Sequence, residues 1–167
     1  VRASWFNQNF SEGFFTDMLR DGVLRLPAGD VREPFIDADD IADVAVAALT
    51  ETGHEGQIYE VTGPRLMTFA EAVEDIARAT GRELRYEQIP VDDYVDGMLA
   101  QQVPEQLVSL TQYLFETVLD GRNASTTDGV QRALGRDPRD FADFARETAR
   151  TGVWAVSGPG EVQPAAD

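Results

Sequence analysis

The sequence predicts an α/β fold with a helix-rich C-terminal part. Short apolar stretches with strand-like alternation are separated by helical patterns as far as about residue 90. Beyond that point the periodic patterns are helical. Strands that alternate with helices normally form a parallel sheet covered on both faces. We therefore expect three or four strands of a parallel core in this chain.

The chain begins with a strand pattern that leads into a helical one. In residues 1–5, Val1, Ala3 and Trp5 alternate with polar residues, which is typical of a strand. A helix is predicted next, because four apolar residues recur at intervals of four: Phe6, Phe10, Phe14 and Met18. No secretory signal pattern is present, so we expect the chain to start inside a fold.

Two short strands and a helix follow. Residues 23–29 predict a strand closed by a turn, and residues 32–36 predict another strand. A helix is expected over residues 37–53, because three Asp residues near its start can accept free backbone N–H groups. Its buried stripe is expected to comprise five residues: Ile41, Val44, Ala45, Ala48 and Leu49.

The clearest local pattern is a capped helix between two strands. Thr68 and Glu71 have the spacing of a capping box, and Gly81 suits the end of that helix. Strands are predicted on either side, at residues 57–63 and 83–90. Four more helices are expected, at about residues 92–98, 104–119, 126–135 and 138–149.

The composition limits the possible partners. Acidic residues outnumber basic ones by 30 to 14, the formal net charge is -16, and every basic residue is Arg. Such a chain repels phosphate backbones, so we expect no nucleic-acid partner and no anionic membrane surface. No apolar run approaches the roughly 20 residues that a membrane helix needs. Cysteine is absent, which is compatible with a cytoplasmic location.

Motifs for phosphate, nucleophile or metal chemistry are missing from the sequence. The two glycine-rich phosphate-binding motifs, Gly-x-Gly-x-x-Gly and Gly-x-x-x-x-Gly-Lys-Ser/Thr, are both absent. The Gly-x-Ser-x-Gly motif is absent as well. The single histidine, His54, lies in a polar connection and is expected to be an exposed loop residue. Asp37, Asp39 and Asp40 could bind a hard cation, but helix capping explains them, so we predict no metal site.

The aromatic residues allow two interpretations. They can simply form a core. Alternatively, Trp5 and Phe6 lie at the carboxyl end of a predicted strand, where open α/β sheets bind their ligands. Tyr113 and Phe115 could then form the opposite wall of a pocket, or could only seal the fold.

Four segments resemble the NmrA-like family of atypical short-chain dehydrogenases/reductases. In chain order they are RASWFNQNF, PFIDADDIADVAVAAL, GQIYEVTGPRLMTFAEAVEDIARATGR and DGRNASTTDGVQRALGRDPRDFADFA. The resemblance covers nearly all of residues 1–152. The family includes NAD(P)H-dependent quinone and azo-dye reductases as well as nicotinamide-sensing regulators.

The resemblance implies only the second half of a Rossmann-like parallel sheet, with a smaller helix-rich lobe on the substrate side. Residues 1–63 would complete the nucleotide-binding domain, residues 64–152 would form that lobe, and residues 153–167 would be a flexible tail. Family members bind the dinucleotide mainly with their first half, which this chain does not resemble. We therefore expect a fragment of an NADP- or NAD-binding protein.

The resemblance also implies roles for individual residues. It places Trp5, Phe6 and Asn9 beside the cofactor. It gives weaker support for three substrate contacts: Phe14, Phe35 and Tyr113. The Tyr-x-x-x-Lys pair of short-chain reductases cannot lie here because Lys is absent, so the catalytic residue is undetermined.

Three functions are compatible with these observations. The first is an oxidoreductase that passes hydride from NAD(P)H to a flat small molecule such as a quinone. The second is a regulator of the same family that binds the cofactor without consuming it. The third takes the chain as complete, a small ligand-binding or dimerising α+β domain, and the unpaired strand edges speak against it. An uncovered sheet edge should also favour association of the chain, including a homodimer.

Overall fold

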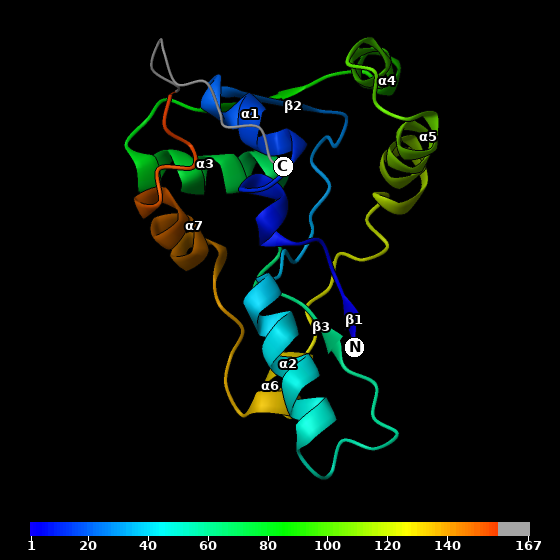
Figure 1. The fold of residues 1–167 in the computed structure, drawn as a ribbon, viewed down its shortest axis with the longest axis vertical. Coiled ribbons are helices and arrows are strands. Elements are labelled where there is room, and N and C mark those ends of the chain that lie inside the picture. The colour runs from blue at the N-terminus through cyan, green and yellow to red at the C-terminus, as the bar shows by residue number, and fades with distance from the viewer. Residues whose placement is uncertain (157–167) are drawn as a thin grey trace, which may run out of the picture.

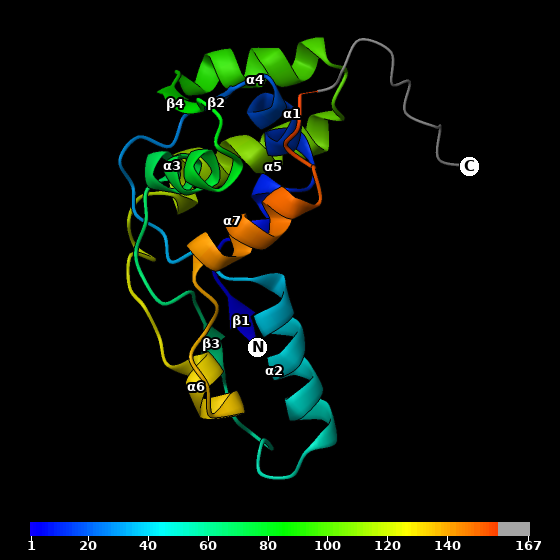
Figure 2. The same ribbon diagram turned by 90° about the vertical axis from the view of Figure 1, so that its left-hand side faces the viewer.

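Two hydrophobic clusters organise the protein, whose computed structural model describes residues 1–156 (Figure 1). The larger cluster lies in the upper part of Figure 1 and the smaller one in the lower part. Figure 2 shows the same division from the side, with several chain segments passing between the two parts. The candidate site lies where these segments cross.

The lower part contains one parallel strand pair and two helices. β1 (Arg2–Ala3) pairs in parallel with β3 (Glu60–Val61). α2 (Ala38–Thr50) and α6 (Gly129–Leu134) pack around this pair through the smaller cluster. The predicted cap of α2 is present, because the Asp37 carboxylate accepts a hydrogen bond from the backbone N–H of Asp39.

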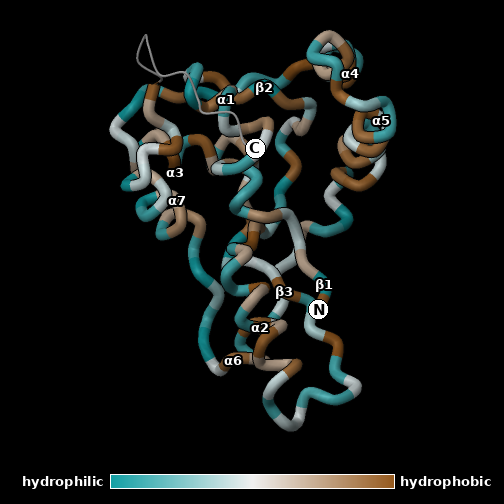
Figure 3. Tube along the Cα trace, in the orientation of Figure 1, coloured by the Kyte–Doolittle hydropathy of each residue, from teal (hydrophilic) through white to brown (hydrophobic). Residues whose placement is uncertain are grey.

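The upper part contains the second parallel pair, β2 (Val23–Leu26) with β4 (Arg85–Gln88). Its helices are α1 (Phe14–Arg20), α3 (Phe69–Thr80), α4 (Val91–Ala100), α5 (Glu105–Tyr113) and α7 (Phe141–Arg150), with a 3-10 turn at Asn7–Phe10 and a π turn at Leu114–Val118. The predicted capping box of α3 is complete, and Gly81 ends the helix with φ 67°. Figure 3 shows apolar residues along α4 and α5, which stand to one side of the larger cluster.

The α/β class is confirmed, with parallel strands and the expected helices, but the described strands form two separate pairs. Residues 32–36, predicted as a strand, form only isolated bridges. Glu33 pairs with Met67, and Ile36 pairs with Phe6. The segment is a bridge between the two parts of the molecule and not a sheet strand.

Two predicted apolar faces are wrong in detail. The helix expected to carry Phe6, Phe10 and Phe14 on one stripe is interrupted at Gly13, which has φ 77°. Phe10, at the end of the 3-10 turn, is buried, whereas Phe6, which precedes that turn, and Phe14, which begins α1, are exposed. In α2 the buried face includes Ala47, and Leu49 is 86% exposed because α6 covers only the other side.

The clusters also differ from the expected division of the chain at residue 63. α1 and β2 contribute to the larger cluster, whereas α6 belongs to the smaller one. The chain therefore crosses between the parts repeatedly. Trp154, in the segment expected to be a flexible tail, is instead buried, and its Nε1 donates to the Phe10 carbonyl at 2.7 Å. The rest of that expectation, beyond residue 156, lies outside the described residues.

Candidate functional site

A cavity of about 730 Å³ opens at the carboxyl ends of β1 and β3. One side is formed by residues 2–6 and Asn9, and another by residues 60–62. The far wall comes from Leu114, Val118 and the loop that follows them. Open α/β sheets bind ligands outside the carboxyl ends of their parallel strands, so the position is that of a ligand site.

Backbone and hydroxyl contacts fix the loop that closes the cavity. The backbone N–H of Thr127 donates to Thr62 Oγ1 at 2.9 Å, and the Thr127 hydroxyl donates to the Glu60 carbonyl. These bonds attach the loop after the π turn to the end of β3. On the opposite side, the Ser4 hydroxyl donates to the Pro34 carbonyl. Hydroxyl-bearing residues at both strand ends therefore shape the opening.

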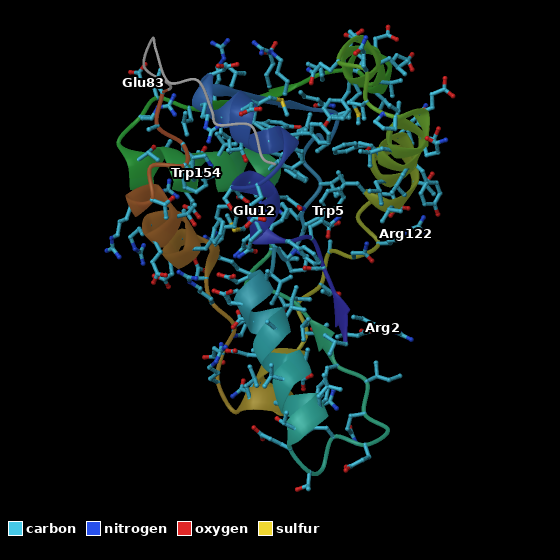
Figure 4. The ribbon with its side chains drawn as sticks, viewed as in Figure 1. Arg2, Trp5, Glu12, Glu83, Arg122 and Trp154 are labelled. Carbon is cyan, nitrogen blue, oxygen red and sulfur yellow. The ribbon has the colours of Figure 1, made fainter. Side chains whose placement is uncertain are left out.

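Two arginines border the cavity, and each is paired with a carboxylate. Arg2 lies 3.2 Å from Glu60, and Arg122 lies 2.7 Å from Asp120. The Arg122 side chain holds the pKa of Asp120 down at about 2. Figure 4 shows Arg122, Arg2 and Trp5 on the same side of the molecule. The rim is therefore polar, with its positive charges largely balanced.

Glu33 borders the same cavity and is completely buried. Neither of its carboxyl oxygens has a hydrogen-bond partner among the described residues. Burial, with a smaller contribution from the nearby negative charge of Asp120, raises the pKa of Glu33 to about 7. Glu33 was not predicted as a site residue, although an acidic residue inside the apolar pattern of residues 32–36 was the available signal.

Trp5, Phe6 and Asn9, the three residues expected beside a cofactor, all line this cavity. The Trp5 ring packs edge-on against Phe69, with 5.8 Å between ring centroids, and lies 6.0 Å from Phe115. The core interpretation and the ligand interpretation of Trp5 are thus compatible. One edge of the indole joins the larger cluster while the residue also borders the cavity. Contact between a cofactor and Trp5, Phe6 or Asn9 stays a prediction.

The three residues expected beside the substrate lie elsewhere. Phe35 is buried in the larger cluster, while Phe14 and Tyr113 are about half exposed, at 48% and 53%. None of the three lines this cavity. Phe115, the other member of the predicted opposite wall, seals the fold against Trp5 and Tyr94. We therefore assign these residues no role at this cavity.

The single histidine is less exposed than expected. The side chain of His54 is 11% exposed, and its Nδ1 lies 2.7 Å from the Tyr59 hydroxyl. The two side chains pack together beside the smaller cluster, which removes His54 from solvent. It lies outside the cavity lining.

The aspartates at the start of α2 do more than cap the helix. Asp37 lies 2.9 Å from Arg139, and Asp40 pairs with Arg136 at 2.5 Å. These ion pairs attach the segment before α7 to the start of α2. Within residues 1–156, no group of three or more His, Cys, Asp or Glu side chains is arranged to hold a metal ion.

Comparison with known proteins identifies the fold family. A model of the NmrA-like family matches residues 1–145, which is most of the chain. The chain belongs to the NmrA-like family. The resemblance of the four sequence segments is thereby confirmed.

Several curated proteins are similar to this NmrA-like chain. An NAD(P)H azoreductase from Xenophilus azovorans is 35% identical over 150 residues, which are 89% of this chain and 52% of that protein. Prestalk A differentiation protein A from Dictyostelium discoideum is 30% identical over 148 residues, which are 89% of this chain and 49% of that protein. The chain spans about half the length of the curated relatives it matches.

Solved structures share the fold of this NmrA-like chain. A triphenylmethane reductase from Citrobacter sp. superposes with a TM-score of 0.76 at 18% identity, over 89% of this chain and 52% of that one. An NADPH-dependent quinone oxidoreductase from Escherichia coli superposes with a TM-score of 0.74 at 19% identity, over 86% and 52%. At this level of identity the likeness supports the fold, which is Rossmann-like.

The cavity residues suit one end of a nicotinamide dinucleotide better than the other. A flat ring can lie against the Trp5 indole, and the Asn9 amide can both donate and accept a hydrogen bond. The pyrophosphate needs backbone N–H groups of a glycine-rich turn, and the sequence has no such motif. Arg2 and Arg122 are already paired with carboxylates. The chain could thus hold the nicotinamide end.

In residues 1–156, no helix is both long enough and apolar enough to cross a membrane.

Proposed function

We propose that the protein is an NAD(P)H-dependent oxidoreductase that reduces a flat electrophilic small molecule such as a quinone. The observation that carries this proposal is the cavity at the carboxyl ends of two parallel strands, bordered by Trp5, Phe6 and Asn9. The names of similar proteins support it, since they include an NAD(P)H azoreductase and an NADPH-dependent quinone oxidoreductase. The cofactor is NADP or NAD.

The work of the chain in this reaction is to position the two reactants and keep out water. The cofactor supplies the hydride when it is bound. Trp5 offers a flat wall for a ring, and Asn9 can fix its orientation by hydrogen bonds. Leu114 and Val118 close the opposite side with apolar surface, which limits the entry of water.

A second function, cofactor sensing without turnover, stays open. The sequence contains no Lys, so the Tyr-x-x-x-Lys pair of short-chain reductases cannot be formed within it. Prestalk A differentiation protein A is moreover a relative whose name describes no reduction. The two functions differ in one measurable property. A sensor binds NADPH without oxidising it, whereas a reductase consumes NADPH when a quinone is added.

The test of the proposed function compares two Trp variants of the full-length protein. Trp5→Ala should weaken NADPH binding or quinone-dependent NADPH oxidation at least tenfold, because the ring wall is lost. Trp154→Ala is the matched control, since Trp154 is buried far along the chain and does not line the cavity. It should lower the melting temperature and leave NADPH affinity unchanged while the protein is folded. Equal NADPH affinity in both variants would assign Trp5 to packing alone.

A further inference from the structure

Glu33 differs from every other buried carboxyl group in residues 1–156. Asp37 has Arg139, Asp40 has Arg136, and Asp75 has Arg65 at 2.6 Å. Glu33 is equally buried, yet neither of its carboxyl oxygens has a hydrogen-bond partner within residues 1–156. The other buried acids therefore stabilise the fold through ion pairs. Glu33 does not.

The backbone holds Glu33 in this position. Its N–H donates to the Met67 carbonyl at 2.9 Å, and its carbonyl accepts from the Met67 N–H at 3.0 Å. The next residue, Pro34, accepts the hydroxyl of Ser4 through its carbonyl. Two connections thus fix the main chain where the chain crosses between the clusters. The side chain borders the cavity, and no hydrogen bond from a described residue orients its carboxyl group.

The surroundings of Glu33 favour a neutral carboxyl group. An isolated carboxylate is costly to bury, so such a group keeps its proton unless a cation is near. Asp120 contributes a nearby negative charge. The cations in the vicinity are engaged elsewhere: Arg32 contacts Glu71 at 3.0 Å, Arg122 contacts Asp120, and Arg2 contacts Glu60. A protonated carboxyl group can donate its hydrogen to a ligand in the cavity.

We propose that Glu33 is the proton donor to the reduced acceptor. This inference rests on the proposed function. Reduction of a quinone requires two electrons with one hydrogen, which arrive as hydride from the cofactor, and one further proton. Glu33 supplies that proton: its O–H bond breaks as a new O–H bond forms at the anionic oxygen of the reduced acceptor. The Glu33 carboxylate then recovers a proton from solvent that enters the cavity once the product has left, which completes the cycle.

A neutral carboxyl donor predicts a specific pH profile. The Glu33 side chain can donate only while it is protonated, and burial places its pKa at about 7. The value of kcat/KM for a quinone such as menadione, measured with NADPH, should therefore fall as the pH rises through about 7. Glu33→Gln keeps the size and a hydrogen-bond donor but cannot release a proton. It should lower kcat about 100-fold with little change in KM, and should flatten the profile.

Two further variants separate chemistry from structure. Glu33→Asp retains the acid and should recover part of the activity with its pH dependence. Glu74→Gln is the matched control, because Glu74 is an exposed glutamate on α3 and lies outside the cavity. It should behave as the unchanged protein does. Circular dichroism at each pH establishes that the variants compared are folded.

A spectroscopic measurement tests Glu33 without cofactor or substrate. Infrared difference spectra recorded between about pH 5 and pH 9 should show the carbonyl band of a buried protonated carboxyl group in the unchanged protein. The band should disappear as the pH rises through about 7, and should be absent from Glu33→Gln. The infrared band also tests whether Glu33 is protonated if Glu33→Gln proves too unstable for kinetics. In that case the spectra of the unchanged protein are compared with those of Glu33→Asp and Glu74→Gln.

The outcomes distinguish the inference from the function on which it rests. If the unchanged protein oxidises NADPH with menadione and Glu33→Gln matches its rate and pH profile, the proton-donor role is overturned and the reductase function stands. A missing infrared band below pH 7 would overturn the role as well. If the unchanged protein binds NADPH but never oxidises it, both proposals are wrong and the sensing function is favoured.

Discussion

Replacing Glu33 by Gln should make the protein more stable at alkaline pH and change its pH dependence below neutrality. The pKa of Glu33 is raised by burial from its ordinary value of 4.5 to about 7. Each unit of pKa corresponds to about 1.4 kcal/mol of free energy. Ionised Glu33 therefore lowers the unfolding free energy by up to about 3 kcal/mol at a pH above its folded-state pKa, relative to the protonated group.

The sign follows from the protons bound in each state. Below about pH 4.5 both the folded and the unfolded chain hold the Glu33 proton, so its contribution to stability is fully present. Between about 4.5 and 7 the folded state keeps the proton and the unfolded state loses it. Stability therefore declines as the pH rises through this range. Above about pH 7 the folded group is also ionised, and the loss is complete.

The assay is urea denaturation of both proteins at several pH values between about 4 and 9. The unfolding free energy of the unchanged protein minus that of Glu33→Gln should fall by about 2–3 kcal/mol from pH 4.5 to pH 8. Taking the difference removes the charge repulsion that both proteins share. Any constant cost of burying the amide also cancels, because only the slope is compared. Glu74→Gln should show no such slope, and parallel curves for Glu33→Gln and the unchanged protein would refute the reasoning.

Two further predictions concern a helix cap and a close backbone approach. Thr68→Ala should lower the unfolding free energy by about 1 kcal/mol through loss of the capping box, and should leave NADPH affinity unaltered. Thr68→Ser is the control and should stay close to the unchanged protein. A loss of activity at an unchanged melting temperature would contradict this. Gly63→Ala should destabilise by about 1–3 kcal/mol or more, because its Cβ would lie 1.9 Å from the Phe35 carbonyl oxygen. Gly97→Ala on α4 is the control, because a Cβ there would meet open space. It should raise the melting temperature slightly, as measured by thermal denaturation.

The parts of the fold that depend on neighbouring residues were predictable from the sequence. The caps of α3 are an example, because Thr68, Glu71 and Gly81 act within one helix and its ends. The strand over residues 23–26 was likewise predicted, since its alternation is local. In both cases the residues that interact in the structure are close together in the sequence, so the sequence pattern alone indicates the interaction.

The parts that depend on distant segments were not predictable in this way. Leu49 is exposed because α6, far along the chain, covers another face of α2. Glu33 is buried because Met67 and the segment around Asp120 meet it from later parts of the chain. The position of Trp5 at the cavity was anticipated from its place after a strand, whereas the composition of the opposite wall was not.

The repeated crossing of the chain between its two clusters has a consequence for how the protein comes apart. Neither cluster is built from one continuous stretch, since α6 lies in the smaller cluster between two segments of the larger one. A single protease cut between residues 61 and 130 would therefore leave each cluster with pieces from both sides of the cut. The two parts should melt in one cooperative transition, and limited digestion should yield no independently folded piece that corresponds to either cluster.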